Sequence, residues 1–309
     1  MPEAETLTIR LLQRADAGAV RRLLETSDYT YYRFSLEEAA RLLELYPAVG
    51  AFTPVPPGPF GRVLGGGGLQ AFLLVNEMAP PSAWIGGFGI ATLRGQRYRD
   101  YLDRLLPPLV AALRPRGVTG LYYSGADIER DWLMEPLEAL GFELKTMLRA
   151  YDKTDYRVPS AGSQRVRVRP FRASDADGLV ELERLCFDPP WRHDARSFAE
   201  VARMYQYFVV AEDERGLAGY QFNVVDMRVG YLVRIATHPR VWGQGVGARL
   251  MAEAIHYFER EGVWKIVLNT EETNTRAHQL YEWFGFYLIK PRGFALGLDI
   301  GENAPTARS

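Results

Sequence analysis

Three glycines alternate with other residues just before an amphipathic stretch, and their backbone amides could bind a phosphate. They are Gly243, Gly245 and Gly247. Backbone N–H groups at the positive N-terminal end of a helix suit a pyrophosphate. The spacing differs from the Gly-x-Gly-x-x-Gly pattern of dinucleotide-binding folds, and no Lys-Ser/Thr pair follows as it does in a P-loop. The alternative is a glycine-rich turn that only lets a helix and a strand pack closely.

A second informative segment runs from Asn274 to Phe286. Asn274, Ala277 and Tyr281 lie three and four residues apart, so they share one face of a helix. Gly285 suits the left-handed conformation that ends many helices. A tyrosine is neutral at pH 7 and can donate a proton. If this segment is considered alone, the alternative is that Tyr281 packs in the core and has no chemical role.

Together the two segments resemble the GNAT acetyltransferase superfamily over residues 165–300. The family's acyl-CoA motif, Arg/Gln-x-x-Gly-x-Gly/Ala, is matched from Trp242 to Gly247, except that Trp242 stands in the Arg/Gln position. Its later motif, Asn-x-x-Ala-x-x-Leu-Tyr-x-x-x-Gly-Phe, is matched at every named position from Asn274 to Phe286. The resemblance implies an acyl-CoA-dependent N-acetyltransferase that uses acetyl-CoA as acyl donor. A non-catalytic CoA-binding sensor or interaction module is the alternative.

The resemblance also implies where acetyl-CoA would bind: in a V-shaped opening between the strands that end near Thr237 and Leu268. Backbone groups of the first strand would bind the pantetheine and polarise the thioester, and the glycine loop would hold the pyrophosphate. Tyr281 would protonate the departing CoA thiolate as general acid. The implied cofactor-binding residues are Ile235, Ala236, Thr237, Gly243, Gln244, Gly245, Val246, Gly247, Ala248, Asn274 and Ala277.

The general base departs from the family pattern. Related N-acetyltransferases carry a glutamate five residues before the motif asparagine, whereas this chain has Asn269 there. An amide cannot take a proton from an ammonium group. Glu271 and Glu272 are therefore the candidate bases, acting directly or through a water. A solvated strand end is the alternative role for these two carboxylates.

Two further similarities concern the acceptor. Residues 182–187 and the Pro190-Trp191 pair are similar to ribosomal-protein alanine N-acetyltransferases, and the two-domain size is similar to that of mycothiol synthase. The implied acceptor is a primary amine of a small molecule or a peptide N-terminus, which attacks the thioester directly. Candidates for the acceptor side, with core packing as the alternative, are Trp191, Tyr205, Tyr207 and Tyr220.

The two halves of the chain contain similar segments: residues 9–16 resemble residues 168–175, and residues 140–145 resemble residues 284–290. The predicted fold class is α/β (α+β), with two tandem GNAT-like domains, each a mixed twisted sheet flanked by helices. The predicted boundaries are a degenerate GNAT-like domain over residues 1–151, a linker over 152–164, an active acetyltransferase domain over 165–300 and a flexible tail over 301–309.

Periodicity predicts the elements of the second half. Expected strands are 165–171, 207–211, 218–225, 230–237, 264–268, 286–289 and 294–300, and expected helices are one capped by Ser174-Asp175, 246–260 and 275–283. The helix over 246–260 should bury a single apolar stripe. That stripe consists of Leu250, Met251, Ala254, Ile255 and Phe258.

The first half carries the same order of elements without the chemistry. Aligning the halves at Gly117 and Gly262 places Tyr98, Asp100 and Leu102 opposite the three glycines. Side chains there would obstruct a pyrophosphate, so we predict that this half binds no cofactor. A proline- and glycine-rich stretch between residues 47 and 68 indicates an inserted surface loop.

Charge, cysteine and histidine content exclude several function classes. Thirty-seven basic and 38 acidic residues leave a net charge of −1, so no global field favours nucleic acid or an anionic membrane. Cys186 is the single cysteine, which excludes an internal disulfide, and the four histidines show no metal-ligand spacing. Neither a secretory signal nor an uncharged stretch of roughly 18 residues is present. We therefore expect a cytoplasmic protein without a metal, and a possible homodimer.

Overall fold

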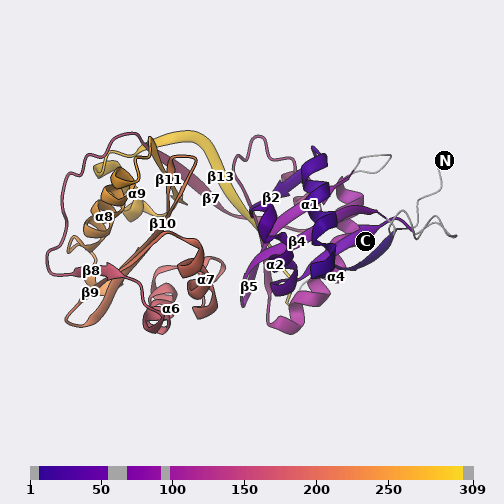
Figure 1. Cartoon of the computed structure of the whole chain (residues 1–309), viewed down its shortest axis with the longest axis horizontal. Coiled ribbons are helices and arrows are strands. Elements are labelled where there is room, and N and C mark those ends of the chain that lie inside the picture. Colours follow the sequence, from indigo (N-terminus) through magenta and orange to yellow (C-terminus); the bar gives the residue numbers. More distant parts are fainter. Residues whose placement is uncertain (1–6, 55–67, 92–97, 302–309) are drawn as a thin grey trace. The chain divides into compact units, whose positions relative to one another are not determined.

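The structure is a computed structural model that describes residues 7–54, 68–91 and 98–301 (Figure 1). The predicted surface loop between residues 47 and 68 and the predicted tail over 301–309 lie mostly outside these residues. None of the helices in the described ranges is both long and apolar enough to cross a lipid bilayer.

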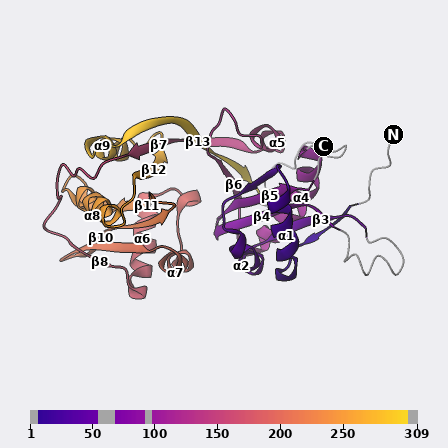
Figure 2. The same ribbon diagram turned by 45° about the horizontal axis from the view of Figure 1, so that its top comes forward.

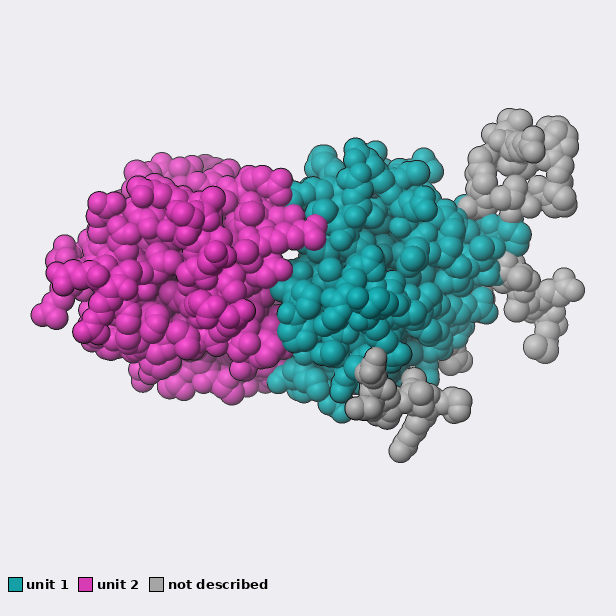
Figure 3. Space-filling view, turned by 90° about the horizontal axis from the view of Figure 1, so that it is seen from below, with its two compact units in different colours: residues 1–125, 130–145, 295–309 teal, residues 126–129, 146–294 magenta. Residues whose placement is uncertain are grey.

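The chain forms two compact units whose residues interleave along the sequence (Figure 3). Unit 1 comprises residues 1–125, 130–145 and 295–309, and unit 2 comprises residues 126–129 and 146–294. The last strand of the chain therefore ends in unit 1, and a strand that begins in the first half enters unit 2. The predicted boundaries at 151 and 165 differ from this division, because strand pairing across the two halves leaves no local mark in the sequence.

Unit 1 is a mixed sheet with helices packed on it. Its strands are β1 (Thr8–Leu11), β2 (Thr30–Tyr32), β3 (Ala48–Phe52), β4 (Leu69–Ala79), β5 (Ser82–Ile90) and β6 (Gly120–Gly125), and its helices are α1 (Ala17–Thr26), α2 (Ala39–Leu45), α4 (Tyr98–Leu113) and α5 (Met134–Ala139). The strand order is β1-β3-β4-β5-β6, with β2 beside β5. The β5–β6 pair is parallel, whereas the β3–β4 and β4–β5 pairs are antiparallel.

Unit 2 is built on the same plan. Its elements are β7 (Glu143–Lys153), β8 (Arg167–Pro170), α6 (Ala176–Cys186), α7 (Ala195–Met204), β9 (Tyr207–Asp213), β10 (Gly216–Asp226), β11 (Val229–Thr237), α8 (Val246–Arg260), β12 (Lys265–Glu271), α9 (Thr275–Trp283) and β13 (Tyr287–Asp299). The strand order is β8-β9-β10-β11-β12-β7-β13. Only the β11–β12 pair is parallel among the registers of this unit. The predicted mixed α/β fold is therefore confirmed.

Most predicted elements of the second half are present. The helix α8 has the predicted bounds, and all five residues of its predicted stripe are buried. The ring of Phe258 lies so close to Gly230 that a Cβ there would be 2.5 Å from Cδ1 of the ring. Two predictions differ: the strands expected over 286–289 and 294–300 form one long strand, and α7 was not predicted.

Helices cover both faces of the sheet in unit 2. Figure 1 shows α8 on one side of β9 and β10, and α6 and α7 on the other, and the turned view in Figure 2 agrees. One hydrophobic cluster joins α8 and α9 to β12, and another joins α6 and α7 to β9 and β10. The sheet is thus held between two apolar layers, which makes it a rigid support for residues at the ends of its strands.

The strand next to β12 on the side away from β11 comes from the first half of the chain. Antiparallel pairing joins β7 to β12 from Leu148 opposite Glu271 to Lys153 opposite Ile266. The side chain of Tyr151 is only 1% exposed and belongs to the core formed with α8 and α9. Without β7, the edge of β12 would present unpaired backbone groups to solvent.

The segment predicted as a linker packs closely on unit 2. The Tyr156 hydroxyl donates to the carbonyl of Val263, and the amide of Ser163 donates to the carbonyl of Gly245 at 3.0 Å. Gly162 adopts a φ of +71°, and a Cβ there would lie 2.1 Å from the backbone nitrogen of Arg249. Gly162 and Ser163 therefore pack against the start of α8, and Tyr156 packs beyond its end.

The pairing of β7 with β12 predicts how stable two fragments of the chain are. A fragment of residues 165–309 retains both sequence motifs but loses the Leu148 and Tyr151 side chains from the core. A fragment of residues 146–309 retains them. We expect the longer fragment to be more stable by at least about 3 kcal/mol, because each large apolar side chain contributes about 1.5–3 kcal/mol. Denaturant unfolding followed by circular dichroism measures the difference, and equal midpoints with equal slopes would contradict the role given to β7.

Candidate functional site

The two parallel strands of unit 2 separate before they end. Parallel pairing of β11 with β12 extends only to Tyr231 opposite Val267. Both strands continue beyond this point, β11 to Thr237 and β12 to Glu271. The register between β10 and β11 shifts so that Val233 has no partner on β10, and such a bulge bends a strand. A pocket of about 730 Å³ lies where the strands diverge.

The pocket brings together most residues predicted for the site. Those that line it are Ile235, Ala236, Thr237, Gly243, Gly245, Val246, Gly247, Ala248, Glu271, Asn274, Ala277 and Tyr281. Two predicted residues do not line it. The Gln244 side chain turns back to donate to the carbonyl of Arg240 at 2.9 Å, and Glu272 lies toward β7. The pocket is also lined by Asn269, which stands in the position of the family's glutamate.

The glycine loop has the conformation that an anion site requires. Gly243 and Gly245 have φ angles of 75° and 77°, a left-handed conformation that side-chain-bearing residues rarely adopt. Gly245 is the N-cap of α8, so the amides of Val246, Gly247 and Ala248 belong to the first helical turn and lack intrahelical acceptors. These donors lie at the positive end of the helix dipole. The loop can therefore bind a phosphate.

Asn274 has a structural role in addition to lining the pocket. Its Oδ1 accepts from the amide of Ala277 at 3.2 Å, which caps α9, and its Nδ2 donates to the Thr270 hydroxyl at 3.2 Å. The cap fixes the start of α9 relative to the end of β12. It thereby also fixes Tyr281, two turns further along the helix.

Tyr281 has the surroundings of a proton donor. Its side chain is 5% exposed, with Tyr151 and Phe286 as ring neighbours at centroid distances of 5.8 Å and 6.1 Å. Burial, with Tyr151 as a lesser cause, raises the pKa of Tyr281 above its ordinary value, so the hydroxyl stays protonated at neutral pH. Within the described part of the chain this hydroxyl has no hydrogen-bond partner, and the residue lines the pocket. It can therefore donate its proton to a bound group.

Glu271 and Glu272 have different surroundings. Glu271 lines the pocket, and its Oε1 accepts from Nε1 of Trp191 at 3.0 Å. Burial raises the pKa of Glu271, opposed by the Trp191 hydrogen bond and reinforced by the charge of Asp188. Glu272 instead accepts two hydrogen bonds from the Arg149 guanidinium, at 3.0 Å and 2.8 Å. Of these two carboxylates, Glu271 is therefore the one that can exchange a proton with a molecule in the pocket.

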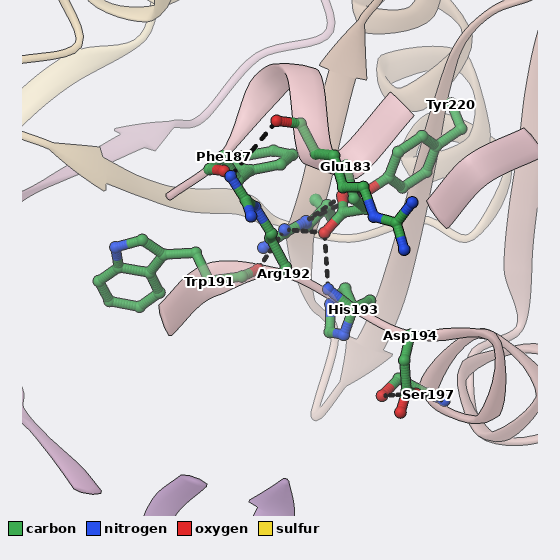
Figure 4. Close-up of polar contacts among 10 residues, drawn as sticks. Glu183, Phe187, Trp191, Arg192, His193, Asp194, Ser197 and Tyr220 are labelled. Atoms are coloured by element: carbon green, nitrogen blue, oxygen red, sulfur yellow. Dashed lines mark hydrogen bonds and ion pairs between the residues drawn. The ribbon is translucent and has the colours of Figure 1, made fainter. Parts of the chain in front are cut away.

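A buried polar network holds the segment that carries Trp191. The fully buried carboxylate of Glu183 on α6 accepts from the Tyr220 hydroxyl, the Arg234 guanidinium and the backbone N–H of His193. Arg234 also donates to the carbonyl of Trp191. Figure 4 shows the Glu183 carboxylate near Tyr220 and the backbone of His193, with the Trp191 ring directed away from them. The network positions the indole ring, and it includes Arg234, which motif reasoning did not identify.

The other aromatic candidates for the acceptor side lie in the core. Tyr220 is fully buried in the network, Tyr205 packs on Phe222, and Tyr207 stacks on Tyr257. None of the three lines the pocket. Among the described residues, no three His, Cys, Asp or Glu side chains are grouped so that they could hold a metal ion.

In unit 1 the corresponding place between parallel strands is occupied by a side chain. Pairing of β5 with β6 extends to Trp84 opposite Tyr122. Just beyond it, the Tyr31 hydroxyl donates to the carbonyl of Ser124 on β6 at 3.0 Å, and its ring packs on Tyr123 at 4.8 Å. Burial raises the pKa of Tyr31 to about 12. A half-buried tyrosine therefore lies at the position that is open in unit 2.

The raised pKa of Glu271 predicts how its replacement affects stability. The folded chain binds a proton at Glu271 more tightly than the unfolded chain does, so this carboxyl costs stability as pH rises through its unfolded and then its folded pKa. Glu271→Gln removes this cost and keeps an acceptor for Trp191. We expect the variant to gain stability relative to the wild type between about pH 4 and pH 7. Urea midpoints at both pH values test this, and a pH-independent difference would contradict it.

Comparisons with known proteins bear on the family to which the second half of the chain is similar. Residues 176–286 match the acetyltransferase (GNAT) family. A Bacillus subtilis (strain 168) protein named "Putative ribosomal protein bS18-alanine N-acetyltransferase" is 29% identical over 139 residues, which are 44% of this chain and 90% of that protein. The mycothiol acetyltransferase of Acidimicrobium ferrooxidans is 25% identical over 172 residues, 50% of this chain and 55% of that enzyme.

Solved structures extend the similarity of the fold to nearly the whole chain. A tandem GNAT protein from the clavulanic acid biosynthesis pathway covers 96% of this chain and is itself fully covered, with a TM-score of 0.65 and 14% identity. A GCN5-related N-acetyltransferase from Sphaerobacter thermophilus covers 98%, with 98% of its own chain matched, a TM-score of 0.61 and 16% identity. The chain therefore contains a GNAT acetyltransferase domain over residues 176–286 and has the fold of tandem GNAT proteins.

Proposed function

We propose that this acetyltransferase moves the acetyl group of acetyl-CoA to a primary amine, on a small molecule or at a peptide N-terminus, by direct attack. The observation that carries the proposal is the pocket between β11 and β12. It is lined by the glycine loop, by Tyr281 and by a carboxylate of raised pKa, Glu271. Binding, proton removal and proton donation thus have candidate residues in one cavity.

In this proposal the pantetheine of acetyl-CoA lies between the separated ends of β11 and β12. Backbone groups of Ile235, Ala236 and Thr237 hydrogen-bond it, and the amides from Gly243 to Ala248 bind the pyrophosphate. Asn274 and Ala277 form the α9 side of the site. One of the candidate groups is already engaged: the carbonyl of Thr237 accepts from Nε1 of Trp242 at 3.0 Å. The other backbone groups of this segment are therefore better candidates than the Thr237 carbonyl.

The chemical step requires three proton transfers. Glu271, directly or through a water, takes a proton from the ammonium form of the acceptor and later releases it to solvent. The neutral amine attacks the thioester carbonyl carbon, a tetrahedral intermediate forms, and its collapse breaks the C–S bond. Tyr281 gives its proton to the departing thiolate, and the second proton, which the nitrogen loses as the amide forms, restores the Tyr281 hydroxyl. A positioned acid and base each contribute about 10²- to 10⁴-fold to a rate.

A CoA-binding sensor without turnover is the second candidate, because Trp242 and Asn269 depart from the family motif. Turnover separates the two. We expect release of free CoA thiol from acetyl-CoA when a panel of amines and peptides is offered. Binding of acetyl-CoA without turnover of any acceptor would favour the sensor.

We expect one acetyl-CoA per chain, bound by unit 2, since Tyr31 fills the counterpart position in unit 1. Calorimetric titration gives the stoichiometry, and two equivalent sites would contradict the proposal. Gly245→Val should weaken binding, because a side chain is strained at this positive φ and its Cβ would lie 3.2 Å from the backbone nitrogen of Ser163, which displaces the loop. Gly262→Val is the matched control: Gly262 also has a positive φ, 63°, but lies at the other end of α8.

Tyr281→Phe should lower turnover about 10²- to 10⁴-fold while leaving acetyl-CoA affinity nearly unchanged, because only the proton for the leaving thiolate is removed. Steady-state kinetics and titration of the same preparation give both quantities. Tyr257→Phe is the control, since Tyr257 belongs to the same core cluster but does not line the pocket. Wild-type turnover in Tyr281→Phe would make Tyr281 a packing residue.

Glu271→Gln should depress turnover at neutral pH and recover as pH rises, when more of the amine is already deprotonated. Glu272→Gln should retain turnover and lose little stability, because its ion pair with Arg149 is partly exposed. pH–rate profiles of both variants make the comparison. A profile that is unchanged in Glu271→Gln, or altered only in Glu272→Gln, would contradict the assignment of the base.

A further inference from the structure

We propose that Arg276 is a phosphate-binding cation of the acetyl-CoA site and that the Trp242 ring holds it in position. This inference rests on the proposed function, and it supplies a charge that the family motif would carry at position 242. The ligand chemistry is a phosphate group of CoA, either the pyrophosphate or the 3′-phosphate.

The first observation is the contact between the two side chains. The guanidinium carbon of Arg276 lies 3.5 Å from the centroid of the Trp242 ring. Both residues line the pocket. Arginine stacks well on an aromatic face, and in that arrangement its five N–H donors remain available around the edge of the group. The stack therefore positions the cation without occupying its donors.

Trp242 is itself fixed, so it can act as a platform. Its Nε1 donates to the carbonyl of Thr237 at 3.0 Å, and its amide donates to the carbonyl of Pro239 at 3.2 Å. The ring is tied to the end of β11, directly before the glycine loop. Arg276 lies at the second position of α9. The contact thus links the starts of the loop and of α9 across the pocket.

The other basic side chains near the loop are already paired. Arg240 is bound to Asp213, and Arg249 is bound to Glu253 at 2.8 Å. Arg234, the second basic residue of the pocket lining, is held by Glu183. Arg276 forms no ion pair or hydrogen bond with any residue in the described ranges, apart from its contact with Trp242. It is therefore the pocket cation whose charge remains available.

The loop supplies amides but no cation of its own. The residues from Gly243 to Ala248 carry no basic side chain, and a pyrophosphate or a phosphate monoester carries charge that neutral amides only partly compensate. An arginine can bind two phosphate oxygens at once. Arg276 provides this from α9, where Trp242 occupies the position that the motif gives to Arg or Gln.

Calorimetric titration with acetyl-CoA and with acetyl-3′-dephospho-CoA tests the proposal. We expect Arg276→Ala to raise the Kd for acetyl-CoA about tenfold or more, as for loss of a charge-assisted hydrogen bond, and to reduce its salt dependence. An equal loss with the dephospho compound assigns the pyrophosphate, and a loss confined to acetyl-CoA assigns the 3′-phosphate. Arg203→Ala is the control. It removes the same charge from the exposed end of α7, outside the pocket lining.

Two further measurements separate a phosphate contact from a structural role. Trp242→Ala should weaken binding nearly as much as Arg276→Ala, with little added loss in the double variant, whereas Trp242→Phe should retain most of the affinity. Acetyl-pantetheine lacks these phosphates, so Arg276→Ala should turn it over at the wild-type kcat/KM.

Unchanged affinity of Arg276→Ala for both CoA compounds, or an equal loss with acetyl-pantetheine, would overturn the inference. Failure of the wild type to bind acetyl-CoA would instead overturn the proposed function.

Discussion

The site depends on the point at which β11 and β12 stop pairing. Up to Tyr231 and Val267 the two strands form a parallel ladder, and beyond it the bulge at Val233 bends β11 away. Backbone groups of β11 thereby become available, and space opens between two strands that are otherwise held in a sheet. If the ladder continued to the end of β12, the pocket would be closed by main-chain hydrogen bonds. In unit 1 a comparable opening is filled by Tyr31, whose hydroxyl bonds the carbonyl of Ser124.

β7, the strand contributed by the first half of the chain, supports this geometry by pairing with β12. β7 pairs along the length of β12, and the side chains of Leu148, Arg149 and Tyr151 reach the surroundings of the site. Tyr151 packs against Tyr281 and binds the buried His278 ring at 2.8 Å, while Arg149 engages Glu272. Because Arg149 binds Glu272, Glu271 is the one of these two adjacent carboxylates that lines the pocket. The first half of the chain therefore has a structural role in the site of unit 2.

Local patterns were sufficient to predict some features but not others. The α8 helix and its buried stripe follow from apolar residues at three- and four-residue spacing, and the pocket residues follow from motifs in which backbone conformation matters more than side-chain partners. The difference between Glu271 and Glu272 depends on Arg149, more than a hundred positions away in the chain, so adjacent carboxylates looked equivalent. The pairing of β7 with β12 could not be predicted for the same reason, because the two strands are far apart in the sequence. Arg276 and Trp242 become a pair only when α9 and the loop meet in space.

The central claim is that acetyl-CoA occupies the opening in unit 2 and not its counterpart in unit 1. Hydrogen exchange with and without saturating acetyl-CoA tests this directly, because it reports on individual stretches of backbone. The account predicts slower exchange at residues 235–237 and 243–248, with no change at residues 85–90 and 121–125. Equal protection of both units, or protection that leaves residues 243–248 unchanged, would contradict it.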